Sequence, residues 1–419
     1  MKIAMMTNSY KPFVAGVPVS IERLSQGLRE IGHEVVIFAP SYNEQKEETD
    51  VVRYHSLVKG IANGFSVPNV LDAKIEKQFR QGKFDVIHVH HPMLIGNTAL
   101  YLSRKYHVPL CFTYHTRYEQ YLHYIKATFL KGIVPAYMNH YMNECDLIFA
   151  PTPSMQTYLE EITDKRKIAV LPTGLCPDSF ETDEDAAREL REKLLGGKKY
   201  LFCTVSRLAK EKNIEFLFQA LAIRKGKGNS DFRLAVVGEG PYKEQLSKCA
   251  RELGIQEEVI FVGKVPNENI KNYYAAADLF LFTSLSETQG IVIIEAMAAA
   301  APVLALNASG VRDIVVNGRN GYMTNVSQTE YVNQLESLLM QERGYLKQGA
   351  LETARKYEMR EIAKWAAFYY NKLKPAGSEF AIQNLVTQNY NRSTFPLING
   401  RLPSIDGRRG GAAWTHFMF

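Results

Sequence analysis

Two glutamates that lie eight residues apart, Glu287 and Glu295, enclose a glycine at position 290. Carboxylates accept hydrogen bonds from hydroxyl groups, so this pair can hold a sugar and a ribose. Gly290 has no side chain to obstruct a ligand, and a helix that begins beside it offers unpaired backbone N–H groups and the positive end of its dipole. The pattern predicts a phosphate-binding loop flanked by two carboxylates, although a single glutamate considered alone is more often a solvated surface charge.

The segment around the glutamates must form a strand, a loop and a helix to position them. Leu279 to Phe282 is a short apolar run typical of a buried strand, and Ser284 to Gly290 is polar. Ile291 to Ala299 has the length and composition of a helix, which Pro302 ends. The sequence therefore predicts that the loop connects a buried strand to the start of a helix.

Two cations follow a second predicted strand, Tyr200 to Val205. They are Arg207 and Lys212. Unpaired cations at the end of a buried strand are costly to desolvate, so a diphosphate is their natural partner. Surface salt bridges are the alternative interpretation.

The run from Glu287 to Glu295, followed by Ala-Met-Ala-x-x-x-Pro-Val, resembles the donor-binding signature of the retaining nucleotide-sugar glycosyltransferases of family four. The resemblance covers residues 1 to about 374. It implies an α/β chain of GT-B fold, in which two Rossmann-like domains with parallel sheets face each other across a cleft. It also implies that Arg207 and Lys212, spaced as the family's Arg-x4-Lys pair, neutralise the leaving nucleoside diphosphate without a metal ion or another cofactor.

The resemblance implies further roles for individual residues. Glu287 would hold sugar hydroxyls and Glu295 the ribose, while His115, in Tyr-His-Thr-Arg, would be a catalytic residue that hydrogen-bonds the donor sugar. The loop around Gly16 is similar to the family's N-terminal glycine loop, although a plain tight turn explains one glycine equally well. Further donor contacts would come from Val265 at the base and from Thr288, Gln289, Gly290, Ile291 and Val292.

The chain departs from the family at Ala300, where glycine is usual. That position suits left-handed backbone geometry after the helix. If the geometry is kept, alanine costs about 1 kcal/mol.

Three histidines, His88, His90 and His91, lie in and after a predicted strand. Alternate strand residues point to opposite faces, and no carboxylate lies nearby in the sequence, so a metal site is disfavoured. We expect His88 and His90 to be core or hydrogen-bonded side chains.

The acidic run Asp183-Glu184-Asp185 formally matches the Asp-x-Asp pattern with which another glycosyltransferase fold binds a metal. Thr182 is a plausible N-cap, and the acids fall in the first turn of a helix that Gly196 ends. Capping and dipole interactions explain the run, so we expect no metal there.

Aromatic and basic residues alternate between Arg117 and Lys131. This composition suits a membrane edge or a lipid-lined groove. A helix that packs an aromatic stripe on the domain core is an equally supported alternative. The candidate membrane or acceptor contacts are Arg117, Tyr121, Lys126 and Lys131.

The chain has 419 residues, of which 46% are hydrophobic, enough for two domains. We expect an N-terminal acceptor domain over residues 1–173, a nucleotide-sugar domain over 174–358, and a helix over about 359–374 that crosses back onto the first domain. Residues 375–419, rich in Gly, Asn, Arg and Ser, are expected to be a disordered or non-native tail.

Charge and cysteine usage limit the partners and the compartment. A net charge of +6 without a long single-sign block allows an anionic membrane surface and gives no indication of nucleic-acid binding. Five cysteines without a CxxC pair, and no apolar stretch of membrane-spanning length, favour a cytoplasmic protein with reduced thiols.

The resemblance implies a retaining hexosyltransferase, and the aromatic and basic segment favours a lipid acceptor. We expect transfer of glucose from UDP-glucose to a lipid hydroxyl such as that of diacylglycerol, by a peripheral protein on the inner face of the cell membrane. Transfer to a soluble sugar or thiol precursor is the main alternative. The second alternative function is that of a GT-B nucleotide-sugar epimerase or a non-catalytic binding module.

Overall fold

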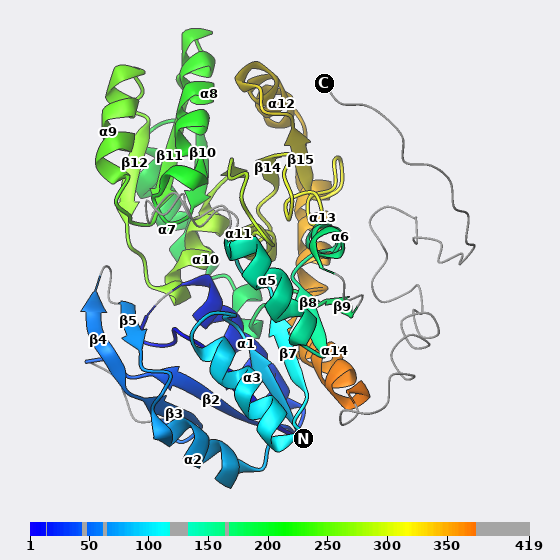
Figure 1. Ribbon diagram of the computed structural model, residues 1–419. Coiled ribbons are helices and arrows are strands. Elements are labelled where there is room, and N and C mark those ends of the chain that lie inside the picture. Colours follow the sequence, from blue (N-terminus) through cyan, green and yellow to red (C-terminus); the bar gives the residue numbers. More distant parts are fainter. Residues whose placement is uncertain (14, 44–47, 62–64, 118–132, 164–166, 374–419) are drawn as a thin grey trace, which may run out of the picture.

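Two parallel sheets with helices packed around them form the computed structural model of the chain (Figure 1). The structure describes residues 1–13, 15–43, 48–61, 65–117, 133–163 and 167–373. The N-terminal sheet has the strand order β3-β2-β1-β6-β7-β8-β9, and the C-terminal sheet has the order β12-β11-β10-β13-β14-β15. The prediction of two Rossmann-like α/β domains is confirmed.

The elements of the N-terminal half alternate between strand and helix, apart from four successive strands, β2 to β5, of which β4 and β5 form an antiparallel hairpin. They are β1 Lys2–Met6, α1 Gly16–Glu30, β2 Glu34–Pro40, β3 Val51–Tyr54, β4 Ser56–Ile61, β5 Phe65–Pro68, α2 Ala73–Gly82, β6 Val86–Val89, α3 Ile95–Tyr106, β7 Leu110–Thr113, α5 Ile133–Glu144, β8 Leu147–Ala150, α6 Pro153–Ile162 and β9 Ile168–Val170.

The C-terminal half also alternates between strand and helix as far as β14, which β15 follows directly, and the described part of the chain ends in α12, α13 and α14. Its elements are η2 Pro177–Phe180, α7 Glu184–Leu195, β10 Tyr200–Val205, η3 Lys210–Lys212, α8 Ile214–Gly226, β11 Phe232–Val237, α9 Lys243–Glu252, β12 Val259–Gly263, α10 Asn267–Ala276, β13 Leu279–Phe282, α11 Ile291–Ala298, β14 Val303–Leu306, β15 Gly321–Thr324, α12 Gln328–Met340, α13 Gly344–Arg355 and α14 Met359–Lys372.

The central strands of both sheets are buried along their whole length, as in β6, β7, β13 and β14. Parallel sheets are covered on both faces, so such strands read as continuous apolar runs. In each sheet the order reverses beside the first strand, because β1 lies between β2 and β6 and β10 lies between β11 and β13. Ligands of open α/β sheets bind outside the carboxyl ends of the strands at such a point, so the loops after these strands are the candidates for function.

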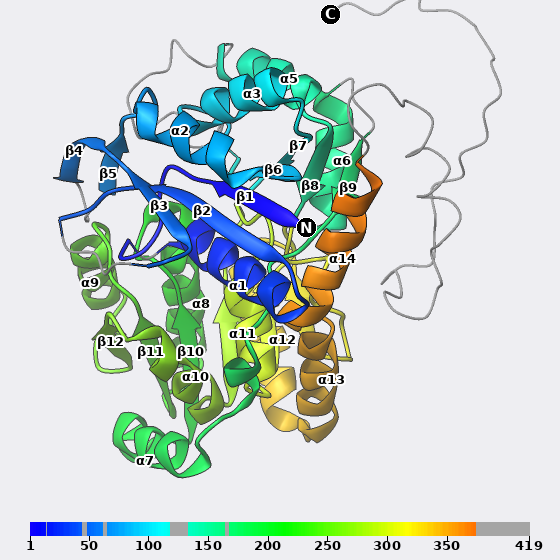
Figure 2. The same ribbon diagram turned by 90° about the horizontal axis from the view of Figure 1, so that it is seen from below.

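Helix α14 follows the C-terminal domain in the sequence but packs on the N-terminal domain beside α1 (Figures 1 and 2). Ile362 and Ala363 of α14 share a buried cluster with Ile21 of α1. Gly27 lets the two helices approach closely, because a Cβ there would lie 2.8 Å from the carbonyl oxygen of Met359.

Two helix starts differ from the expectation. Helix α1 begins at Gly16 rather than near Ser20, because Pro18 fits the first turn, where its missing N–H has no intrahelical partner. Helix α7 is capped by Asp183, whose carboxylate accepts a first-turn N–H at 2.9 Å, and not by Thr182.

Parts of the expectation fall on residues outside the described ranges. These are the tail from residue 375 and the candidate contacts Tyr121, Lys126 and Lys131. Within the described ranges, every helix is too short or too polar to cross a bilayer.

Ala300 follows α11 and has a φ of 56°, in the left-handed region. The left-handed geometry that the family's usual glycine suits is therefore kept here with an alanine. The Cβ of an L-residue crowds the following carbonyl oxygen in this conformation, at a cost of about 1 kcal/mol.

We expect Ala300→Gly to raise the free energy of unfolding of the C-terminal domain by up to about 1 kcal/mol, because glycine adopts this conformation without the strain. Chemical denaturation of the wild type and the variant measures the difference. The matched control is Ala299→Gly: Ala299 is buried with a φ of −89°, so glycine there should lower the free energy of unfolding. Equal losses in both variants would show that Ala300 stores no strain.

Candidate active site

The loop of residues 284–290 lies between β13 and α11, as predicted. Gly290 is the N-cap of α11, with φ and ψ of 78° and 54°, a left-handed conformation that glycine adopts readily. A second loop packs against this one, because a Cβ at Gly310 would lie 2.8 Å from the carbonyl oxygen of Glu287. The predicted helix N-terminus is confirmed, and the backbone that leads to it is held by a neighbouring loop.

Lys212 and Glu287, two of the predicted catalytic residues, form an ion pair. Nζ of Lys212 lies 2.7 Å from Oε1 of Glu287, and the two side chains are 20% and 16% exposed. Burial acts to raise the pKa of Glu287, but the charge and hydrogen bond of Lys212 outweigh it and hold that pKa below its ordinary value. Glu287 is therefore ionised at neutral pH and accepts hydrogen bonds.

Reciprocal hydrogen bonds fix the position of Lys212. The side-chain amide of Asn213 donates to the carbonyl oxygen of Thr283 at 3.1 Å, and the Thr283 hydroxyl donates to the carbonyl oxygen of Asn213 at 3.0 Å. The connection after β10 is thereby tied to the end of β13, which places the cation beside the carboxylate.

Arg207 lies in the same connection, but its side chain is 52% exposed and pairs with Glu211. This contact is a surface salt bridge, which is the alternative to a diphosphate contact that the sequence analysis considered. The role of Arg207 toward a diphosphate therefore stays a prediction.

Glu295 is engaged by the other domain. Nη2 of Arg23, on α1, lies 2.6 Å from Oε1 of Glu295, and the Tyr274 hydroxyl donates to Oε2 at 3.3 Å. Arg23 also donates to the carbonyl oxygen of Gly174 at 3.3 Å. Sequence reasoning missed Arg23, since no motif surrounds it and 272 residues separate it from Glu295.

Thr288 and Gln289, predicted donor contacts, use their side chains to hold the N-terminal domain. The Thr288 hydroxyl donates to the carbonyl oxygen of His115 at 3.0 Å. The Gln289 amide pairs with the backbone of Thr173, accepting its N–H at 2.8 Å and donating to its carbonyl oxygen at 3.1 Å. Both side chains therefore tie the candidate phosphate loop to the other domain.

The remaining predicted donor contacts lie around this loop. A Cβ built at Gly16 meets no atom within 4 Å, so packing does not require glycine there. Val265 and Val292 are half-buried and pack against the apolar cluster around α11, and Ile291 is half-buried at the start of that helix. Their contacts with a donor stay predictions.

His115 is hydrogen-bonded to His90, which was predicted to be a core or hydrogen-bonded residue. Nδ1 of His90 lies 2.9 Å from Nε2 of His115, and Nε2 of His90 is buried without a hydrogen-bond partner in the described part of the chain. Burial, together with nearby histidines, holds the pKa of both rings well below the usual value. His90 and His115 are therefore neutral at pH 7, and His90 is a neighbour that orients the predicted catalytic histidine.

His88 confirms the expectation of a hydrogen-bonded core residue. Its Nδ1 lies 2.7 Å from the Tyr370 hydroxyl of α14, and its Nε2 lies 2.6 Å from the Thr113 hydroxyl. Among the residues that the structure describes, no three His, Cys, Asp or Glu side chains gather as metal ligands would.

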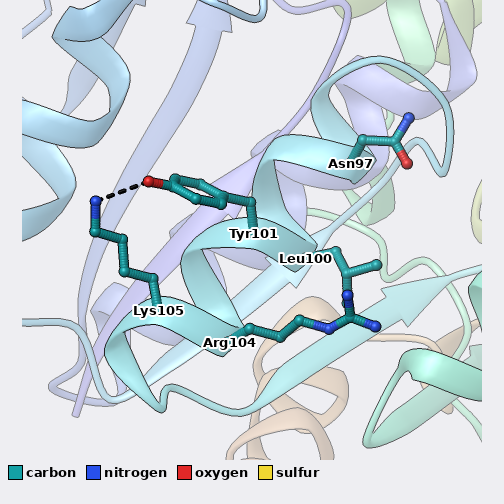
Figure 3. Close-up of a pocket in the computed structure, with 5 residues that line it drawn as sticks. All are labelled: Asn97, Leu100, Tyr101, Arg104 and Lys105. Carbon is teal, nitrogen blue, oxygen red and sulfur yellow. Dashed lines mark hydrogen bonds between the residues drawn. The ribbon is translucent and has the colours of Figure 1, made fainter.

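The outer face of α3 carries a hollow lined by aromatic and basic residues (Figure 3). Nζ of Lys105 donates to the Tyr101 hydroxyl at 2.7 Å, and Arg104 lies beside them. Arg117, a candidate acceptor contact, stacks its guanidinium 4.5 Å from the centre of the Tyr158 ring. The full lining of the hollow is Asn97, Leu100, Tyr101, Arg104 and Lys105.

Two family models match the chain. The model of Glycosyltransferase Family 4 matches residues 14–179, and the model of Glycosyl transferases group 1 matches residues 185–357. The α-monoglucosyldiacylglycerol synthase of Streptococcus pneumoniae is 32% identical over 321 residues, which cover 73% of this chain and 71% of that protein. The protein of the same name from Acholeplasma laidlawii is 27% identical over 343 residues, which cover 78% of this chain and 86% of that protein.

Solved structures share the fold. HepE of Anabaena in complex with UDP is similar with a TM-score of 0.70 at 20% identity, covering 89% of this chain and all of that one (100%). Sucrose-phosphate synthase of Thermosynechococcus elongatus has a TM-score of 0.74 at 19% identity, and the match covers 88% of this chain and 98% of that one. At this identity the likeness shows the GT-B arrangement of two domains.

We expect the buried histidines to make stability depend on pH. Burial lowers the pKa of His88 from 6.5 to about 3, so the unfolded chain binds a proton that the folded protein does not. This stability is present above pH 6.5 and is lost as the pH falls toward 3, by up to about 1.4 kcal/mol per pH unit. His88→Gln should reduce the slope of unfolding free energy against pH between about pH 6 and 4.5.

Denaturant titrations at several pH values measure that slope. The control is His107→Asn, because His107 is exposed and its φ of 54° suits asparagine. A slope that His88→Gln leaves at the wild-type value would contradict the assignment of a neutral His88.

Proposed function

The chain belongs to glycosyltransferase family 4, and on this premise we propose that it transfers glucose from UDP-glucose to diacylglycerol and retains the α configuration at the anomeric carbon. The activity would be that of a bacterial 1,2-diacylglycerol 3-α-glucosyltransferase. Two relatives named as α-monoglucosyldiacylglycerol synthases support the choice of sugar and acceptor. The neighbour HepE, solved with UDP-glucose, supports the choice of donor.

The proposal for the donor rests on the ion pair of Lys212 and Glu287 beside Gly290. A diphosphate at the N-terminus of α11 meets a cation and a helix dipole, and the ionised Glu287 meets the hydroxyls of the attached sugar. Negative charge grows on the diphosphate as the glycosidic bond breaks. Groups that are fixed before the reaction stabilise this charge most in the transition state, so we propose that no metal ion is required.

Retention requires the new bond to form on the face from which the diphosphate leaves. The acceptor oxygen bonds to the anomeric carbon, the bond from that carbon to the phosphate oxygen breaks, and the leaving phosphate takes the acceptor proton. His115 is neutral because burial lowers its pKa, so in this scheme it donates a hydrogen bond to the sugar and does not add a charge.

The proposal for the acceptor is supported by the outer face of the N-terminal domain. Tyr101, Arg104 and Lys105 of α3 present an aromatic ring and two exposed cations, which pair with Glu144 and Glu76 (Figure 3). Aromatic and long basic side chains of this kind suit the membrane interface, and cations attract anionic headgroups. We propose a peripheral protein on the inner face of the cell membrane.

Radiolabelled nucleotide sugars test the proposed reaction in the presence of excess EDTA. We expect UDP-glucose to label diacylglycerol, and we expect the product to have an α linkage by NMR. Arg207→Ala and Lys212→Ala should each reduce turnover by roughly 10²- to 10³-fold, the effect of removing one preorganised charge partner. Label that enters only soluble acceptors would overturn the proposed acceptor, and a preference for another nucleotide sugar would overturn the proposed donor. Activity that requires Mn²⁺ would overturn the metal-independent mechanism.

Binding to lipid vesicles tests the membrane surface. If the segment from Arg117 to Lys131 meets headgroups, each cation contributes on the order of 1 kcal/mol, and Lys126→Glu with Lys131→Glu should release the protein from anionic vesicles. The matched control is Lys193→Glu with Lys248→Glu, which makes the same charge change on exposed positions of the C-terminal domain. Equal release by both pairs, or recovery on neutral vesicles that salt does not affect, would contradict a specific surface.

A further inference from the structure

We propose that Arg23, on α1 of the N-terminal domain, is a positioning residue that orients Glu295 for the two ribose hydroxyls of the donor nucleotide. The inference rests on the proposed function, because it assumes that a nucleotide binds at the C-terminal domain. It goes further by assigning to the N-terminal domain a residue that controls how the ribose is recognised.

The guanidinium of Arg23 is held at two points. Nη2 bonds Oε1 of Glu295 at 2.6 Å, and Nη1 donates to the carbonyl oxygen of Gly174 at 3.3 Å. The side chains of Arg23 and Glu295 are 13% and 20% exposed, so solvent screens the pair weakly. The planar fork of arginine suits two acceptors in different directions, which the single ammonium of lysine matches less well.

Tyr274 supplies the second contact to Glu295. Its hydroxyl donates to Oε2 at 3.3 Å, and its ring is buried. Burial, followed by the charge of Glu295, raises the pKa of Tyr274 well above the usual value. The phenol therefore keeps its proton at neutral pH and acts as a donor to the carboxylate.

The two contacts leave acceptor sites of a defined geometry. An ionised carboxylate has about four lone-pair positions, two on each oxygen. Arg23 uses one position on Oε1 and Tyr274 uses one on Oε2. One position remains on each oxygen, which matches a pair of vicinal hydroxyls such as those of a ribose.

Arg23 also holds the Glu295 side chain in place. A half-buried carboxylate without its cation tends to rotate toward solvent, and its oxygens then no longer face the ligand. Helix α1 lies on the side of the N-terminal domain that faces α11 (Figure 2). Ribose recognition therefore depends on contact between the domains.

A purely structural salt bridge makes a different prediction. It would alter stability and the affinity for every nucleotide equally, whereas a positioning residue alters the discrimination between nucleotides with and without ribose hydroxyls. A third arrangement, in which Arg23 competes with the ribose for Glu295, predicts tighter binding after Arg23 is removed.

Calorimetric titration of the full chain with UDP, GDP and their 2′,3′-dideoxy analogues separates these cases. We expect the wild type to prefer the ribonucleotide over its dideoxy analogue by about tenfold or more, the effect of two modest hydrogen bonds. In Arg23→Met this ratio should fall to within about threefold, and Arg23→Lys should restore part of it. Glu295→Gln should lower the ratio as well. The double variant, Arg23→Met with Glu295→Gln, should reduce the ratio by no more than the larger of the two single reductions.

Two further variants serve as controls. Arg29→Met removes an arginine from the same helix whose partners, Asp50 and the carbonyl oxygen of Val35, lie in the N-terminal domain, so its ratio should stay at the wild-type value. Tyr274→Phe removes one hydroxyl and should reduce the ratio by roughly two- to threefold. If Arg23→Met does not fold, Tyr274→Phe still tests the inference.

Each outcome has a distinct meaning. A wild type that binds neither UDP nor GDP overturns the proposed function, and the inference with it. The inference alone is overturned if the wild type binds the nucleotide and Glu295→Gln changes the ratio of ribonucleotide to dideoxynucleotide affinity, while Arg23→Met and Tyr274→Phe do not. Tighter ribonucleotide binding by Arg23→Met, or a wild type without discrimination, also overturns it.

Discussion

The chain passes between its two domains twice, at Leu175 and at Glu358, and the two passages lie side by side. The Leu175 N–H donates to the carbonyl oxygen of Tyr357 at 2.6 Å, and the Met359 N–H donates to the carbonyl oxygen of Leu175 at 2.8 Å. Gly174 permits this approach, since a Cβ there would lie 2.6 Å from the Cα of Met359. Because both passages meet at one place, they limit how the domains can sit relative to each other, and every contact between the domains at the candidate site depends on this constraint.

The loop of residues 284–290 serves both domains at once. Thr288 and Gln289 bond the N-terminal domain, while Glu287 bonds Lys212 within the C-terminal domain. A ligand that moved this loop would also disturb the interdomain contacts, and a change in domain placement would move the loop. In the proposed function, donor binding and domain contact are therefore coupled through one short segment, and the bond between Arg23 and Glu295 adds a second link of the same kind.

The carboxylates of the site have protein cations as partners. Lys212 lies beside Glu287, and Arg23 lies beside Glu295. Half-buried charges are costly unless they are paired, so each cation offsets the cost of burying its carboxylate. They also hold each side chain in one orientation before a donor arrives, which lowers the entropy cost of binding.

Local sequence determined the strand, loop and helix from Leu279 to Ala299, because the apolar run, the polar loop and Pro302 act over a few residues. The resemblance to the family pointed to Ala300, and the left-handed geometry found there suits a residue that directly follows a helix. Tertiary structure alone decided the partners: Arg23 and Glu295 are 272 residues apart, and the ring contact of His90 with His115 joins two different strand ends. Such contacts depend on how two sheets are placed by the sum of many packing interactions, and no local pattern of residues encodes that sum.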